Sequence, residues 1–241
     1  MIGALGPTDV ADVISAQLQA LGTPERAAGE QAYLKSALTH FGTSVPDMRA
    51  VVRRHVRALA PDHDDVIAIC DALWAQPVHE RRMAAVELLA FRPALLSVDD
   101  LPWIELVLRD CRTWALVDTI AGVVVARIVL DDPLGLDVLD RWVVDDDVWI
   151  RRSAVLGLRS VLRAGRELDR FERYSDLLLG EREFFIRKAL GWVAREVGRQ
   201  QPGAIAAWLR ARLDRMNGVT IREAVKYLPD GDAILAEWKA R

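Results

Sequence analysis

Trp114 and Asp118 are the residues whose types and spacing most directly suggest chemistry. Residues four apart share one face of a helix, so an indole ring and a carboxylate would lie next to each other there. An aromatic face attracts a cation, and a fixed carboxylate stabilises positive charge that develops in a transition state. Each residue also has a structural interpretation, with Trp114 as a packing aromatic and Asp118 as a helix cap or the partner of an arginine.

Other familiar site motifs are missing from the sequence, which contains no Gly-rich phosphate loop and no G-x-S-x-G element. No cysteine lies in a C-x-x-C motif and no histidine pairs with another at helical spacing; these residues are Cys70, Cys111, His40, His55, His63 and His79. We therefore expect buried, reduced thiols, no metal site and no cofactor.

Apolar residues recur with a helical period along almost the whole chain, and alternating strand-like runs are missing. Pro, Asp, Ser or Thr precedes many of these periodic runs, as in "GTPERA", "TSVPDMRAVV", "APDHDDVIAI", "DDPLGLDVLDRW" and "DDDVWIRRSAVLGL". The sequence predicts an all-α protein of short helices joined by short connections.

An internal repeat organises these helices. Four segments share the pattern Arg-x-Ala-apolar, namely "RMAAVELL" from Arg82, "RSAVLGL" from Arg152, "RKALGWV" from Arg187 and "REAVKYL" from Arg222. The last three begin 35 residues apart, and the interval from Arg82 to Arg152 is twice as long. A helix-pair unit of this period predicts an α-solenoid of HEAT-like helical repeats, an α-α superhelix with a concave surface.

One stripe of the repeated helix mixes aromatic with ionisable residues, which a buried face would not tolerate at corresponding positions. We expect this stripe to be exposed on the concave face. Its members are Trp114, Asp118 and Gly122; Trp149, Ser153 and Gly157; Phe184, Lys188 and Trp192; and Val219, Glu223 and Tyr227. The Arg-x-Ala arginines recur so regularly that an inter-repeat ladder of arginines and carboxylates is an alternative to DNA contacts.

The whole chain, 1–241, is expected to form a single HEAT-like repeat domain. Residues 1–40 would be N-terminal capping helices, 41–230 the repeats and 231–241 a C-terminal helix. Charge is uneven, because residues 1–148 hold 13 Lys/Arg against 23 Asp/Glu while residues 149–241 hold 19 against 12. The second part is therefore basic enough to meet a polyanion. No leader or membrane-spanning run is recognisable, so we expect a cytoplasmic, monomeric protein.

Five segments, in chain order, resemble the AlkD-like DNA alkylation repair proteins, over roughly residues 30 to 230. They are "YLKSALTHFGTSVPDMRAVVR", "CRTWALVDTIAG", "WIRRSAVLGL", "EFFIRKALGWVAREVGRQQP" and "IREAVKYL". The resemblance implies a DNA glycosylase built of HEAT-like repeats with a concave DNA-binding face. Such an enzyme excises positively charged N3- or N7-alkylated purines, such as 3-methyladenine and 7-methylguanine, from duplex DNA in base excision repair without flipping the base.

The resemblance also implies roles for individual residues. Trp114 and Asp118 match the family's catalytic Trp and Asp, and Trp192 matches its second active-site Trp. An arginine of "WIRR", Arg152 in preference to Arg151, matches its DNA-contacting Arg.

Lys188 and Arg151 are further candidate phosphate contacts, by their type and place in the repeat. Ala115 stands where the family commonly has an acidic residue and Leu116 where it has a small polar one, which bears on substrate preference. The alternative function is a non-catalytic HEAT-like module that binds DNA or protein, since a fold alone does not fix a function.

Overall fold

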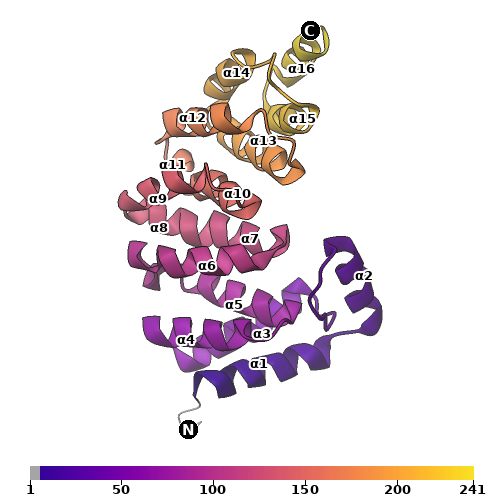
Figure 1. The fold of residues 1–241 in the computed structure, drawn as a ribbon, viewed down its shortest axis with the longest axis vertical. Coiled ribbons are helices and arrows are strands. Elements are labelled where there is room, and N and C mark those ends of the chain that lie inside the picture. The colour runs from indigo at the N-terminus through magenta and orange to yellow at the C-terminus, as the bar shows by residue number, and fades with distance from the viewer. Residues whose placement is uncertain (1–5) are drawn as a thin grey trace. The chain divides into compact units, whose positions relative to one another are not determined.

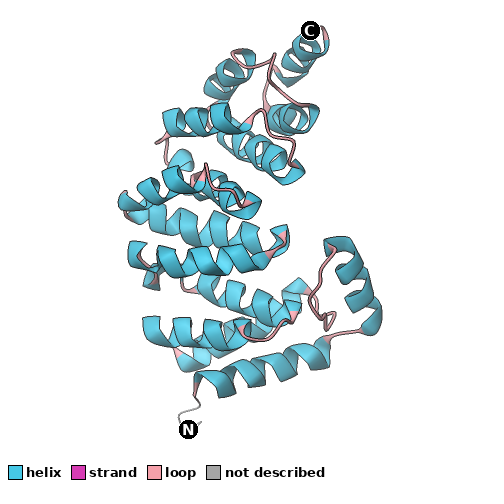
Figure 2. Cartoon of the chain, in the orientation of Figure 1, coloured by secondary structure: helices cyan, strands magenta, loops and turns pink. Residues whose placement is uncertain are grey.

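The computed structural model describes residues 6–241, and these residues form helices joined by short loops (Figure 2). The only β-type pairing among them is an isolated bridge between Thr39 and Val78. The predicted all-α class is therefore confirmed. None of the helices in residues 6–241 has the length and apolar character needed to cross a bilayer.

The helices divide between two compact units, each of which we describe by itself. Unit 1 comprises the chain up to Ser97 together with Ala115–Ile120, and unit 2 comprises Val98–Trp114 and Ala121–Arg241. The predicted organisation into capping helices and repeats of one domain stays a prediction.

In unit 1 the helices α1, α3, α4 and α5 pack against one another around an apolar core, whereas α2 makes no extensive helix contact (Figure 1). The helices are α1 (Pro7–Leu21), α2 (Pro24–Leu34), α3 (Val45–Leu59), α4 (His63–Trp74) and α5 (His79–Phe91). The N-cap side chains of Thr23, Ser44 and Asp62 each accept a hydrogen bond from the first turn of their helix, as the sequence predicts.

Unit 2 holds the later helices, with α10 and α13 at the centre of its packing. They are α6 (Leu101–Cys111), α8 (Ala126–Asp131), α9 (Leu134–Trp142), α10 (Val148–Gly157), α11 (Arg159–Arg163), α12 (Leu168–Leu178), α13 (Phe184–Gly198), α14 (Pro202–Arg210), α15 (Gly218–Ala224) and α16 (Gly231–Lys239). Helix α7 (Trp114–Thr119) continues through a π-helical turn, Ile120–Val125, into α8. The helices that carry the repeated motif start at His79, Trp114, Val148, Phe184 and Gly218, close to the predicted period.

Small residues sit at the helix contacts, as the repeat predicts. Ala84, Ala154, Ala189 and Ala224 are all fully buried, while Thr119, the member that is not alanine, is half-buried. Close helix approach leaves room for little more than a methyl group at such a position.

Ion pairs and hydrogen bonds connect successive repeats within unit 2. The Glu105 carboxylate of α6 accepts hydrogen bonds from the Arg141 Nη2 and Trp142 Nε1 atoms of α9, each at 2.7 Å. It also accepts one from Arg109 Nη2 at 2.7 Å, and Arg109 in turn pairs with Asp145 at 2.6 Å. Apart from the Arg109–Glu105 pair within α6, these contacts join residues 36 or 37 apart. Side-chain contacts therefore recur at close to the period of the sequence repeat.

Substitution of Glu105 tests this connection. Burial alone raises the pKa of the Glu105 carboxyl, but hydrogen bonds from Arg141, Arg109 and Trp142 outweigh it and lower the pKa to about 2. The contribution of Glu105 to stability is therefore complete above the ordinary pKa near 4.5 and is lost as the pH falls towards 2. We expect Glu105→Gln to lower the free energy of unfolding at pH 7 by about 1–3 kcal/mol. The same substitution should also reduce the fall in the free energy of unfolding between pH 4.5 and 2.

Urea unfolding at a series of pH values measures both effects, with Glu25→Gln on the exposed surface of α2 as the control. An unchanged pH profile in Glu105→Gln would show that the carboxylate does not connect the repeats.

Candidate functional site

Trp114 and Asp118 lie one helical turn apart in α7, and both are half-buried. Between them, Leu116 and Val117 are fully buried. Helix α7 therefore turns one face into the protein and leaves the indole and the carboxylate partly accessible on another, because positions four apart share a face. Trp114 and Asp118 thus share a face of α7, and their place on a concave, DNA-facing surface stays a prediction.

The π-helical turn that follows Asp118 contains Gly122, which the end of the Arg159 side chain approaches closely. A Cβ atom at this position would lie 2.4 Å from Nη1 of Arg159, the first residue of α11. The same Nη1 donates a hydrogen bond to the Gly122 carbonyl at 3.4 Å. Gly122 is thus buried under an arginine, which corrects its assignment to the exposed stripe. Ser153 and Gly157 are buried as well, so the stripe is not accessible in that repeat.

Arg159 also covers Trp192 of α13. Its guanidinium carbon lies 4.7 Å from the centre of the indole ring, within the range of a cation–π interaction. Glu196, one turn further along α13, accepts hydrogen bonds from Arg159 Nε at 2.9 Å, Arg159 Nη2 at 3.0 Å and Trp192 Nε1 at 2.6 Å. Trp192 itself is half-buried. The carboxylate balances the arginine charge and fixes the orientation of the indole.

Arg159 and Glu196 are not among the residues predicted from the sequence, because the predicted stripe ends at Trp192 and Arg159 lies outside the helices that carry the motif. Arg159 lies 37 residues before Glu196 and 37 after Gly122, so each lies two residues further along its repeat than the one before. A search for opposite charges and glycines at this slightly longer period is the signal that could have found them.

Lys188 is ion-paired in the structure. Its ammonium group contacts the Glu223 carboxylate of α15, and Arg195 of α13 pairs with the same carboxylate. The Lys188 side chain is still 42% exposed, whereas that of Glu223 is only 12% exposed. A phosphate near Lys188 would therefore compete with a fixed carboxylate for the ammonium group.

Arg151 and Arg152, the other two predicted DNA contacts, also have partners within unit 2. Arg151 pairs with Glu181 at 2.8 Å and donates hydrogen bonds to the carbonyls of Asp145 and Asp146. Arg152 is only 2% exposed and donates to the Phe185 carbonyl. A guanidinium buried to this extent helps to join α10 to α13. The predicted DNA contact of Arg152 stays a prediction.

Arginines without an ion-pair partner among residues 6–241 occur in α3, where Arg53, Arg54 and Arg57 are exposed. These three arginines, with Ala50 and Ala58, line a surface hollow of about 570 Å³. These arginines were not predicted as DNA contacts, because α3 belongs to the acidic part of the chain. Charge summed over a long segment hides a basic cluster on one of its helices.

Together these features define an all-α, helical-repeat protein with an indole and a carboxylate on one accessible helix face. The chain belongs to the DNA alkylation repair enzyme family, whose model matches residues 14–228. Its structure is similar to that of a predicted DNA alkylation repair enzyme from Enterococcus faecalis, with a TM-score of 0.76 and 19% sequence identity. That similarity covers 86% of this chain and 97% of the other, and at this identity it is evidence for the fold. No curated protein sequence matches the chain. Family membership supports a role in the repair of alkylated DNA.

Replacement of Arg159 tests the cluster around Trp192. Arg159→Leu leaves the mostly buried Glu196 with only the indole N–H as a donor, so we expect the free energy of unfolding to fall by about 1–3 kcal/mol. Arg127→Leu is the matched control, because Arg127 and Asp131 form an ion pair that is about half exposed and should contribute no more than ~0.5 kcal/mol. Urea unfolding at pH 7 compares the two variants, and equal losses would show that Arg159 is an ordinary surface arginine.

Proposed function

We propose that the protein is a DNA glycosylase that hydrolyses the N-glycosidic bond of positively charged N3- or N7-alkylated purines in duplex DNA. It leaves an abasic site and does not flip the damaged base, as the resemblance to AlkD-like proteins implies. The observation that carries the proposal is the placement of Trp114 and Asp118 on one accessible face of α7, in a chain that belongs to a DNA alkylation repair family.

The lesion itself supplies part of the chemistry. Alkylation at N3 or N7 puts a positive charge on the purine, so the base leaves without being protonated by a general acid. The sugar then becomes oxocarbenium-like as the glycosidic bond stretches. A carboxylate about 4 Å from that charge would contribute on the order of 4 kcal/mol at an effective dielectric constant near 20. We assign this role to Asp118, which would also orient the attacking water.

The two tryptophans would recognise the charge of the lesion. An aromatic face next to a cationic nucleotide contributes roughly 0.5–2 kcal/mol, and a neutral purine receives no such contribution. For Trp192, Arg159 already occupies one face of the ring, so only the opposite face is available to a nucleotide. Glu196 offsets the repulsion between Arg159 and a cationic base, because it pairs with the guanidinium through two oxygens.

The DNA backbone requires cations that can contact phosphates without losing an internal partner. Arg54 and Arg57 of α3 meet this requirement, and Arg53 has only a cation–π contact with Phe91, 5.0 Å from the ring centre. We propose all three as phosphate contacts. Lys188 and Arg151 remain candidates that would have to share their charge with Glu223 and Glu181. Contacts of this kind hold the duplex without reading its sequence, so specificity would be for damage.

The alternative function is a non-catalytic module that binds DNA or protein. The internal pairing of Lys188, Arg151 and Arg152 favours it, because a basic surface that is already neutralised binds a polyanion weakly. The enzyme is preferred because the chain belongs to a DNA alkylation repair enzyme family, and Trp114 and Asp118 match the catalytic residues that the resemblance implies.

The decisive measurement is the release of free 7-methylguanine and 3-methyladenine from methylated duplex DNA by the purified protein. We expect the wild type to release both bases, Asp118→Asn to lower the rate by about 10²-fold or more, and Trp114→Ala to lower it as well. Asp146→Asn, at an exposed loop position, is the matched control and should keep the wild-type rate. No release by the wild type, or equal release by Asp118→Asn, would leave the binding module as the function.

DNA affinity should fall steeply with salt concentration despite the acidic overall charge, since phosphate contacts release counterions. Fluorescence anisotropy with a labelled duplex at several salt concentrations measures the slope. We expect Arg54→Ala/Arg57→Ala to reduce the magnitude of the slope by about 2, and Arg127→Ala to leave it unchanged. Affinity independent of salt would point to a protein partner instead of DNA.

A further inference from the structure

Helix α2 of unit 1 lacks the usual means of attachment to a protein core. None of its 11 residues is buried, and it makes no extensive contact with another helix. Burial of an apolar face normally provides most of the stability of a helix in a protein, and a helix this short is marginal by itself. Another interaction must hold α2 in place.

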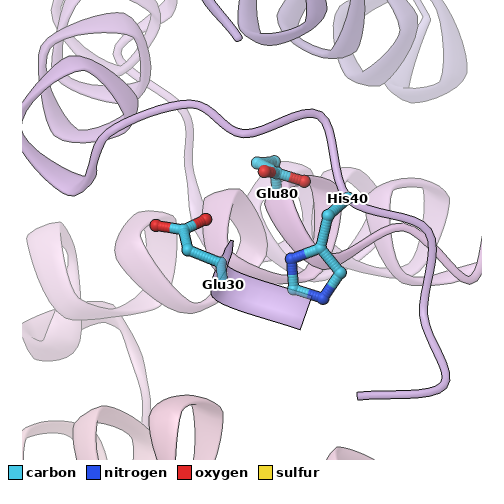
Figure 3. A group of neighbouring side chains, drawn as sticks. All are labelled: Glu30, His40 and Glu80. Carbon is cyan, nitrogen blue, oxygen red and sulfur yellow. The ribbon is translucent and has the colours of Figure 1, made fainter. Parts of the chain in front are cut away.

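A group of three metal-ligating side chains brings together α2, the loop that follows it and α5 (Figure 3). Glu30 comes from α2, His40 from the loop that follows α2, and Glu80 from the first turn of α5. One ligand atom from each lies within 4.8 Å of the other two. In tetrahedral zinc coordination the ligand atoms are about 3.4 Å apart, so side-chain movements of about 1 Å would suffice to bind an ion.

Three of the potential ligand atoms in this group have no hydrogen-bond partner. Both ring nitrogens of His40 and one carboxylate oxygen of Glu30 are buried without a hydrogen bond. The other Glu30 oxygen pairs with Arg26 at 2.5 Å. Buried polar atoms are rarely left unsatisfied, so these atoms indicate a missing partner.

Glu80 is held in position for such a partner. It is fully buried and accepts hydrogen bonds from the backbone amides of Phe41, Gly42 and Thr43 at 2.8, 2.7 and 3.3 Å. It forms no ion pair within residues 6–241, so the buried carboxylate has no cationic side chain to balance it. A divalent cation would supply that charge, and hydrogen bonds to a ligating carboxylate fix its orientation.

The imidazole of His40 is also oriented by its surroundings. His79, the first residue of α5, stacks on it with ring centroids 4.5 Å apart and an angle of 11° between the rings. The adjacent Thr39 exchanges backbone hydrogen bonds with the segment before α5, donating to the Pro77 carbonyl and accepting from the His79 amide. A surface hollow of about 640 Å³, lined in part by Thr39, His40 and Phe41, would give an ion access to the site.

We propose that Glu30, His40 and Glu80 bind one divalent metal ion of the zinc type, which attaches α2 and its following loop to α5. Imidazole nitrogen and carboxylate oxygen are both ligand types that Zn²⁺ accepts, and a water molecule would complete four-coordination. The site lies in unit 1 and takes no part in the glycosidic chemistry proposed for Asp118. Its role is structural, because the ligands come from three segments and α2 has no buried residue of its own.

Zinc binding by the full-length protein tests the proposal. After removal of metals with a chelator, isothermal titration with Zn²⁺ should give one equivalent bound per chain. X-ray absorption should show one imidazole among oxygen ligands, and Zn²⁺ should protect the amides of residues 24–44 from hydrogen exchange. His40→Gln and Glu30→Gln should each weaken binding at least tenfold.

Two control variants each remove a carboxylate or an imidazole that lies away from the three ligands. Glu25→Gln is on the same helix as Glu30, and His63→Ala removes an exposed imidazole; both should bind Zn²⁺ like the wild type. Circular dichroism checks that each variant folds. Absence of stoichiometric binding, or equal affinity in His40→Gln and His63→Ala, would overturn the proposal. DNA glycosylase activity is measured separately, so its presence or absence does not decide the matter.

Discussion

Contacts between side chains about one repeat apart are the interactions on which unit 2 depends. A helix pair of this size cannot bury its apolar face alone, so each repeat must be fixed against the next. Fully buried alanines allow the helices to approach closely, and pairs such as Arg109 with Asp145 and Arg159 with Glu196 connect positions 36 or 37 residues apart. Loss of one carboxylate therefore leaves a mostly buried cation without its partner in the neighbouring repeat.

The same contacts restrict what the basic part of the chain can do. Its excess of positive charge suggests a surface for DNA, but Lys188 and Arg151 are paired with carboxylates and Arg152 is buried in helix packing. A cationic side chain that is paired with a carboxylate of the next repeat is only partly available to a phosphate. The exposed arginines of α3 form no ion pair among residues 6–241, although they belong to the acidic part of the sequence.

The surroundings of Trp192 show how a structural contact and a functional group can share residues. Arg159 connects the π-helical turn to α13, balances Glu196 and covers one face of the indole. A ring fixed in this way presents a defined face and loses little entropy when a nucleotide binds. Helix α2 of unit 1 differs, because it has no buried residue. We propose that it is attached through Glu30, His40 and Glu80 instead.

The sequence by itself determined the helical class, the period of the repeats, several helix starts and the shared face of Trp114 and Asp118. These features are local, since helical periodicity, N-cap residues and four-residue spacing all act within a few turns of chain. Only the tertiary structure decided that Arg152 is buried, that Arg159 rather than a stripe residue meets Trp192, and that Glu30, His40 and Glu80 come together. Those outcomes depend on which side chains face each other across different helices, and contacts between distant segments leave no local pattern in the sequence.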